Sequence, residues 1–230
     1  MADISVGIVP SPQAQPIASY PYADIAAGIG ITPFYGVVIT SGDAAYPPND
    51  QTSYYLTSNQ PYSDNVIVSG AIIAAPDGGY VNNLNYDMIF NLPQNIKGKA
   101  SLNISLGGFR TAGGSNPNIW VSGATIQNAT TSTTLGTSVN SANLILTATG
   151  VNSQTMLMEF DLTSQVYHFK AGETLRLNLP IWGTGGSSSG LSYGGYGADP
   201  KDRDDPDSRT LAATTTSQMV LYLPFLLNNL

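Results

Sequence analysis

The stretch Lys170–Trp182, KAGETLRLNLPIW, decides the fold class of this chain. Aliphatic residues fill every second position in it, with polar residues or proline between them: Leu175, Leu177, Leu179 and Ile181. A second stretch, Thr214–Phe225, TTTSQMVLYLPF, repeats the alternation. An apolar period of two predicts a β-strand with one face toward a core. We therefore expect both stretches in the core of one β-sandwich, joined by a long polar surface loop at 183–214.

Shorter runs with similar patterns precede these two stretches. They predict strands at 34–40, 53–57, 65–74, 86–92, 102–106, 119–126, 144–149 and 156–161. Glycine, proline and asparagine separate the runs, and none of the segments shows a convincing helical period. The sequence thus predicts an all-β protein, an antiparallel β-sandwich of jelly-roll type, with residues 23–230 forming a single domain.

The first 22 residues have a different composition, with several prolines among small residues. Such a composition predicts an extended Pro-rich N-terminal arm at 1–22 without a core of its own. Two interpretations stay open: a disordered tail, or an arm that lies on a neighbouring subunit.

Targeting signals are not evident in the sequence. Its start lacks the basic and apolar segments of a secretion signal, and no apolar run approaches the roughly 18 residues of a membrane span. We therefore expect synthesis in the host cytoplasm and no membrane partner. Asn103 and Asn128 each match the acceptor pattern for N-glycosylation, which we do not expect to be used without a secretion signal.

Charge is scarce and unevenly placed. Charged residues make up 10% of the chain, and the net charge of −7 lies entirely before Lys97, where seven Asp precede the first Lys or Arg. A nucleic-acid partner is disfavoured, because phosphate binding needs clustered Lys and Arg. The lack of Cys excludes disulfides, thiolate metal sites and a Cys nucleophile. Solubility then depends on hydroxyl and amide groups, a pattern typical of a surface covered by neighbours.

Groups suited to catalysis are few. His168 is the single histidine, and no nucleophile signature accompanies it, which favours an ordinary histidine at a strand end or an interface. Glu159 and Asp161 share one face of an expected strand, as a glycosidase pair would, but two solvent-facing acids are the favoured interpretation. We therefore expect no enzymatic activity and no organic cofactor.

An acidic cluster lies in the expected surface loop. Its five aspartates are interleaved with basic residues: Asp199, Asp202, Asp204, Asp205 and Asp207. Dense carboxylates could supply the oxygen ligands that calcium prefers. The interleaved cations favour instead a loop held by its own salt bridges, and Pro206 breaks the spacing of an EF-hand. A calcium loop stays open as the alternative.

Tyrosine is the dominant aromatic residue, with thirteen copies. A flat ring with a polar tip suits protein interfaces and sugar-binding surfaces alike, and the scattering of these residues favours interfaces. With the prolines of the arm, they give the expected interface residues: Pro10, Pro12, Pro16, Tyr20, Tyr22, Tyr54, Tyr55, Tyr193 and Tyr196. Trp120 and Trp182 support the sugar-binding alternative.

Several segments together resemble β-rich structural proteins of tailed bacteriophage heads and related virions. They are YADIAAGIGITPFYG at 22–36, NLPQNIKGKASLNISLG at 91–107, FKAGETLRLNLPIWG at 169–183, and GADPKDRDDPDSRT with TTSQMVLYLPF at the end. The resemblance implies a capsid-associated protein, of the kind that forms jelly-roll cement or decoration subunits and sits as a trimer on the shell. It implies no catalytic residues.

The expected function is therefore that of a virion structural protein located on the capsid surface. It would be a homotrimeric cement or decoration subunit that clamps neighbouring capsomers on the outer face of the major capsid protein lattice. Two alternatives stay open: a jelly-roll major capsid protein that forms the shell itself, and a carbohydrate-binding or receptor-binding module.

Overall fold

The computed structural model describes residues 29–41, 51–58, 79–110, 116–184, 191–197 and 219–226. Within these ranges the regular elements are all β-strands, and they belong to one sheet. The strands are β1 (Ile29–Ser41), β2 (Gln51–Thr57), β3 (Gly79–Ile89), β4 (Gln94–Ile96), β5 (Lys99–Arg110), β6 (Asn118–Val121), β7 (Thr125–Asn128), β8 (Thr133–Thr137), β9 (Ala142–Ile145), β10 (Gly150–Asp161), β11 (Tyr167–Phe169), β12 (Thr174–Thr184), β13 (Leu191–Gly197) and β14 (Val220–Leu226).

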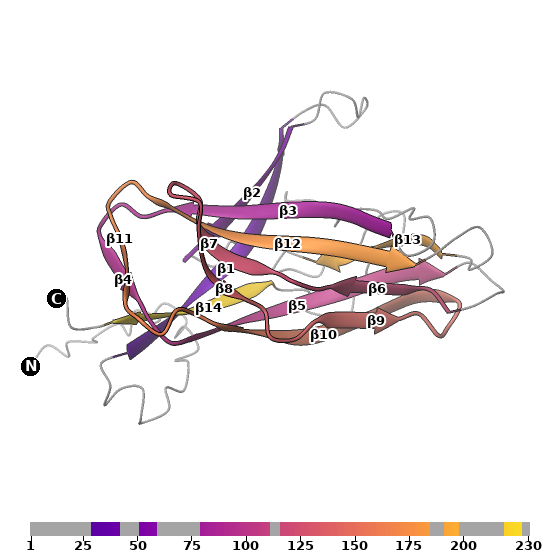
Figure 1. Ribbon diagram of the computed structural model, residues 1–230. Coiled ribbons are helices and arrows are strands. Elements are labelled where there is room, and N and C mark those ends of the chain that lie inside the picture. The colour runs from indigo at the N-terminus through magenta and orange to yellow at the C-terminus, as the bar shows by residue number, and fades with distance from the viewer. Residues whose placement is uncertain are drawn as a thin grey trace, which may run out of the picture.

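The sheet curls so that its two ends meet, which gives a flattened barrel with two facing layers (Figure 1). The strand order is β10-β5-β14-β1-β2-β3-β12-β6-β9, and β7 continues from β12 to β8. The described pairs are antiparallel, except that β2 and β3 meet in parallel at Tyr55 and Asp87. The structure thus confirms the predicted all-β class, an antiparallel sandwich of jelly-roll type, whose layers are halves of one curved sheet.

The barrel closes along a line that we call the seam, where residues 138–145 lie beside β10. Ser138 forms an antiparallel bridge with Phe160. The side chain of Asn140 then takes the place of a backbone peptide group. Its Oδ1 accepts a hydrogen bond from the N–H of Glu159 at 2.8 Å, and its Nδ2 donates to the carbonyl of Leu157 at 2.9 Å. Closure therefore depends on a short stretch of backbone pairing and on one side-chain amide.

The alternation in the two defining stretches is visible in their burial. On β12 the four aliphatic side chains are fully buried, while Arg176 and Asn178 between them stay partly exposed. On β14 the predicted core residues Leu221 and Leu223 are buried and Phe225 is partly buried, but Val220 and Pro224 of the opposite parity are buried as well. β14 lies inside the sheet between β1 and β5, and it is a buried strand rather than a half-buried one.

Other expected strands are present with shifted ends. The strand expected at 119–126 is divided into β6 and β7, because the chain turns at Gly123, whose φ of 71° suits glycine. β4 and β11 were not expected, since three residues are too few for alternation to show. The strand expected at 65–74 and the arm at 1–22 lie outside the described residues.

β13 corrects the prediction of an unbroken surface loop at 183–214. It runs within that segment and pairs with β5 in antiparallel fashion. Its sequence, LSYGGYG, alternates no aliphatic residues, so it carries no sign of a strand with a core face. This strand is therefore formed by backbone pairing with β5 and not by the burial of alternating apolar side chains.

β1 and β2 form a hairpin that projects from the barrel, above β3 in Figure 1. β1 pairs with β14 up to Tyr35 and with β2 from Tyr35 to its end. β2 in turn meets β3 at Tyr55. Beyond these points the two strands pair with each other and with no other strand of the described chain. We call residues 38–41 and 51–54 the projecting ribbon.

Candidate functional site

Tyr54 and Tyr55 lie at the base of the projecting ribbon and have different surroundings. Tyr55 is 45% exposed, as a residue that contacts a partner would be. Tyr54 packs against the core and meets Tyr86 nearly edge-on, with ring centroids 5.3 Å apart. Burial raises the pKa of Tyr54 above its ordinary value of 10.0. Tyr55 is thus open to a partner, whereas Tyr54 anchors the ribbon to the barrel.

Most of the other predicted site residues lie outside the described residues. These are Pro10, Pro12, Pro16, Tyr20 and Tyr22 of the arm, and Asp199, Asp202, Asp204, Asp205 and Asp207 of the acidic cluster. Tyr193 and Tyr196 lie on β13, whose backbone pairs with β5. In the described part of the chain, no group of three or more His, Cys, Asp or Glu could hold a metal. The calcium loop stays a prediction.

The residues considered for catalysis lie on open surface. Glu159 and Asp161 are exposed on the outer face of β10, and the Asp161 carboxylate lies 3.4 Å from Lys99 Nζ. His168 is exposed on β11, and its Nδ1 lies 2.7 Å from Oδ1 of Asn95 on β4. A solvated carboxylate beside a solvated lysine has the surroundings of an ordinary surface ion pair. These positions agree with the interpretation of Glu159 and Asp161 as solvent-facing acids.

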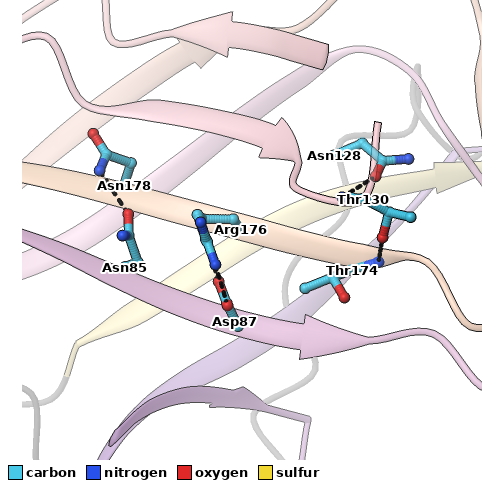
Figure 2. Close-up of polar contacts among 7 residues, drawn as sticks. All are labelled: Asn85, Asp87, Asn128, Thr130, Thr174, Arg176 and Asn178. Atoms are coloured by element: carbon cyan, nitrogen blue, oxygen red, sulfur yellow. Dashed lines mark hydrogen bonds and ion pairs between the residues drawn. The ribbon is translucent and has the colours of Figure 1, made fainter. Parts of the chain in front are cut away.

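Rows of polar side chains cross the outer face of β3 and β12 (Figure 2). Arg176 binds Asp87 through two hydrogen bonds of 2.6 Å, and this hydrogen bonding raises the pKa of Arg176. Two positions further along β12, Nδ2 of Asn178 donates to Oδ1 of Asn85 at 2.7 Å and also to Asn83. Because these groups satisfy one another, the face is strongly polar but has no net charge.

Both tryptophans of the chain lie on this same outer face, toward the other end of β12. Trp182 is the register partner of Trp120 on β6. Their rings are nearly parallel, with an interplanar angle of 9° and centroids 6.3 Å apart. Each is partly exposed, and Trp120 has the exposed Asn143 of β9 as its partner on the other side. We call Trp120 and Trp182 the tryptophan pair. The sequence analysis singled out both residues but did not predict that they are in contact.

A buried polar cluster, which the sequence did not predict, is centred on Asn128. This residue is fully buried, and its Nδ2 donates to Glu173 Oε2 at 2.9 Å and to Tyr167 Oη at 3.1 Å. Its Oδ1 accepts from the N–H groups of Thr130 and Thr131, at 2.9 and 3.2 Å. All the hydrogen-bonding capacity of the amide is therefore used. The acceptor pattern at Asn128 is structural, because a buried and fully bonded Nδ2 cannot receive a glycan.

Arg110 is a second buried polar residue that the sequence analysis missed. It is 8% exposed, and its Nη1 lies 2.7 Å from Asn116 Oδ1 and 3.1 and 3.0 Å from the carbonyls of Leu146 and Thr147. The guanidinium thus ties the end of β5 to the segment that follows β9. No local pattern around Arg110 distinguishes it from a surface arginine.

Exposed aliphatic side chains occur on the outer side of the seam. Val139 is 57% exposed and Leu157 is 50% exposed. Both belong to the segments that meet there, since Val139 N–H donates to the carbonyl of Glu159 at 2.9 Å. Apolar side chains on an outer face are candidates for contact with another molecule. In the described ranges no helix is long and apolar enough to span a membrane.

Comparison with known proteins adds little to this geometry. No family model matches the sequence, and no curated protein matches it significantly. Similar solved structures include a CocE/NonD family hydrolase from Staphylococcus aureus, at 11% identity and a TM-score of 0.36 over 86% of this chain and 34% of that chain. They also include the infectious bursal disease virus Gt strain, at 12% identity and a TM-score of 0.20 over 87% of this chain and 55% of that chain.

The chain therefore spans about a third of the length of the hydrolase, 34% of that chain. At TM-scores this low, neither similarity carries an argument about this protein.

Proposed function

We propose that this protein is a virion structural protein, a trimeric cement or decoration subunit that binds the outer face of a capsid and holds neighbouring capsomers together. The observation that carries the proposal is the projecting ribbon. An element that leaves the barrel has the geometry to reach an adjacent subunit (Figure 1).

The energetics of the ribbon support a role in contact. A two-stranded hairpin is marginally stable in water, because it has no third strand and little apolar surface to bury. Its outer backbone edges also carry hydrogen-bonding groups that can pair with another chain. Contact with a neighbouring protein would supply the missing packing, and Tyr55 at the base of the ribbon adds an exposed aromatic ring to that contact.

The rest of the described surface suits many modest contacts. The strongest ion pair, Arg176 with Asp87, is neutral as a unit. Val139 and Leu157 offer apolar contact along the seam. Weak contacts repeated around the symmetry axes of a shell add to a large total, so no single contact has to be strong.

Particle composition is the direct test. Nuclease-resistant particles would be purified on a density gradient from the culture that makes this protein, and their chains counted by mass spectrometry. We expect this chain in the particles at a fixed ratio to a more abundant shell protein, and accessible to antibody on intact particles. Absence of this chain from the particles would refute the proposal. If this chain were the most abundant protein of the shell, the protein would instead be the major capsid protein.

A shortened ribbon tests the proposed contact. Ile39 and Ser53 are register partners, so replacing residues 40–52 by Asn-Gly closes the hairpin with a two-residue turn and keeps Tyr54 in place. We expect the variant to keep the melting temperature of the barrel but to lose its place on particles. Light scattering of each protein should give three times its own chain mass, which is 24.1 kDa for the natural chain.

A further inference from the structure

We propose that the outer face around the tryptophan pair binds neutral oligosaccharides. This activity is separate from the attachment of the subunit to a shell. The proposal follows from three features of the face: its aromatic rings, its amides and its charge balance.

The tryptophan pair supplies the aromatic surface. The apolar C–H face of a pyranose ring stacks on an indole, because the C–H groups are attracted to the negative face of the ring. Trp120 and Trp182 are held by direct strand pairing and lie within 9° of parallel, so their orientation is set before a ligand arrives. Preorganised rings lose little entropy on binding.

Amide groups extend the face along β12. Asn178 lies four residues from Trp182 on the same side of the strand, a distance of about 13 Å at the usual rise per residue. Its Nδ2 donates to Asn85 and Asn83, and the amide groups that these bonds do not use, Oδ1 of Asn178 and Nδ2 of Asn85, can pair with sugar hydroxyls. Asn143 offers a further exposed amide directly beside Trp120. The distances suit a chain of several sugar units rather than a monosaccharide.

The charge balance selects a neutral sugar. Arg176, which lies on this face, is bound on two nitrogens by Asp87, so its charge is neutralised toward a carboxylate or sulfate. The net charge of −7 over the whole chain also repels acidic glycans. Neither feature affects a neutral oligosaccharide.

The neighbours of the tryptophan pair distinguish a sugar from a protein partner. Aromatic residues that anchor protein interfaces lie in desolvated pockets, ringed by contacts that exclude water. Here the described side chains next to the pair on the outer face include the amides of Asn143 and Asn118, with Ile145 and Pro180 as the apolar contributions, and the register partner of Trp182 on β3 is Tyr80. A wet, amide-rich border around stacked rings fits hydroxyl recognition better than protein docking.

Intrinsic fluorescence gives a direct readout, because Trp120 and Trp182 are the two tryptophans of the sequence. The full-length protein would be titrated with cellohexaose, chitohexaose, maltohexaose and mannohexaose, and with hexagalacturonic acid as the acidic counterpart. We expect at least one neutral hexasaccharide to shift the emission in a saturable way, and the acidic one to leave it unchanged.

Substitutions locate the site, with binding measured by calorimetry. Trp120→Ala and Trp182→Ala should each weaken binding at least about tenfold, since each removes a stacking surface. Tyr55→Ala, which removes an exposed ring from another part of the barrel, should leave binding unchanged. Far-ultraviolet circular dichroism checks folding, and Trp120→Phe and Trp182→Phe replace any alanine variant that fails to fold.

Three results would overturn the proposal. They are the lack of a response to every neutral hexasaccharide at millimolar concentration, a response to the acidic one alone, and binding that survives loss of either indole. These binding measurements use the purified protein and do not depend on particle composition, which tests the shell role. The proposed sugar site and the proposed shell role can therefore be refuted independently.

Discussion

Asn128 donates through Nδ2 to Oε2 of Glu173 at 2.9 Å, and the same carboxylate oxygen accepts the N–H of Lys170 at 3.0 Å. One buried amide thus joins the end of β7 to the turn before β12. Thr130 reinforces the junction, because its Oγ1 accepts the N–H of Thr174 at 3.0 Å (Figure 2).

Replacing Asn128 by alanine should lower the free energy of unfolding by about 2–4 kcal/mol, because it removes one donor to Glu173 and leaves two backbone N–H groups without their acceptor. Asn83→Ala is the matched control, since Asn83 is exposed, and it should change stability by less than about 0.5 kcal/mol. Urea denaturation measures both. Equal effects of the two substitutions would contradict the role assigned to Asn128.

Gly136 should tolerate no side chain. A Cβ there would lie 2.7 Å from the carbonyl oxygen of Asp161, which is backbone and cannot move aside. We expect Gly136→Ala to cost about 2 kcal/mol or more. At Gly36 a Cβ would meet the end of the flexible Met219 side chain, so Gly36→Ala should cost less, about 1 kcal/mol. Thermal unfolding of both variants measures the two costs. A larger loss of stability in Gly36→Ala than in Gly136→Ala would refute the packing described at Gly136.

Tyr54 should make stability fall at alkaline pH. Its pKa is raised by burial, so its contribution is fully present below its ordinary pKa of 10.0 and is lost as the pH rises through the folded-state value. The free energy of unfolding should therefore drop more steeply above about pH 10 in the natural protein than in Tyr54→Phe. Tyr55→Phe, at the exposed neighbouring ring, should follow the natural protein. Identical curves for all three proteins would rule out the effect.

Asn140→Ala should loosen the seam. The substitution removes the acceptor of the Glu159 N–H and the donor to the Leu157 carbonyl, at a cost of about 1–2 kcal/mol. Hydrogen exchange followed by nuclear magnetic resonance should show faster exchange at Glu159, while amides of β12 stay protected. Unchanged protection at Glu159 would show that backbone pairing alone closes the barrel.

Local patterns in the sequence predicted a substantial part of the fold. The alternation of Leu175, Leu177 and Leu179 reports burial directly, since side chains of a strand point to opposite faces in turn. Such a pattern specifies a strand and its core face but not its partner. The choice of β6 as the neighbour of β12, which brings Trp120 to Trp182, depends on pairing between residues far apart in the chain.

The elements missed by the sequence analysis share a physical reason. β13 exists through backbone bonds to β5, and backbone groups are the same in every residue. Asn128 and Asn140 act through partners that lie distant in sequence. From sequence alone, an asparagine in a buried cluster cannot be distinguished from one in a surface turn. Polar residues with long-range roles therefore leave no periodic signal.

The position of β14 has a consequence for how the protein is made. β14 lies between β1 and β5 and pairs with both, although the ribosome synthesises it after the other described strands. β1 and β5 must therefore emerge from the ribosome with open edges, and those edges stay open until β14 has been synthesised. Exposed edges invite pairing with other chains, so slow synthesis or crowded expression should favour aggregates over folded protein. Proteolytic loss of this one strand would reopen both edges in the finished molecule.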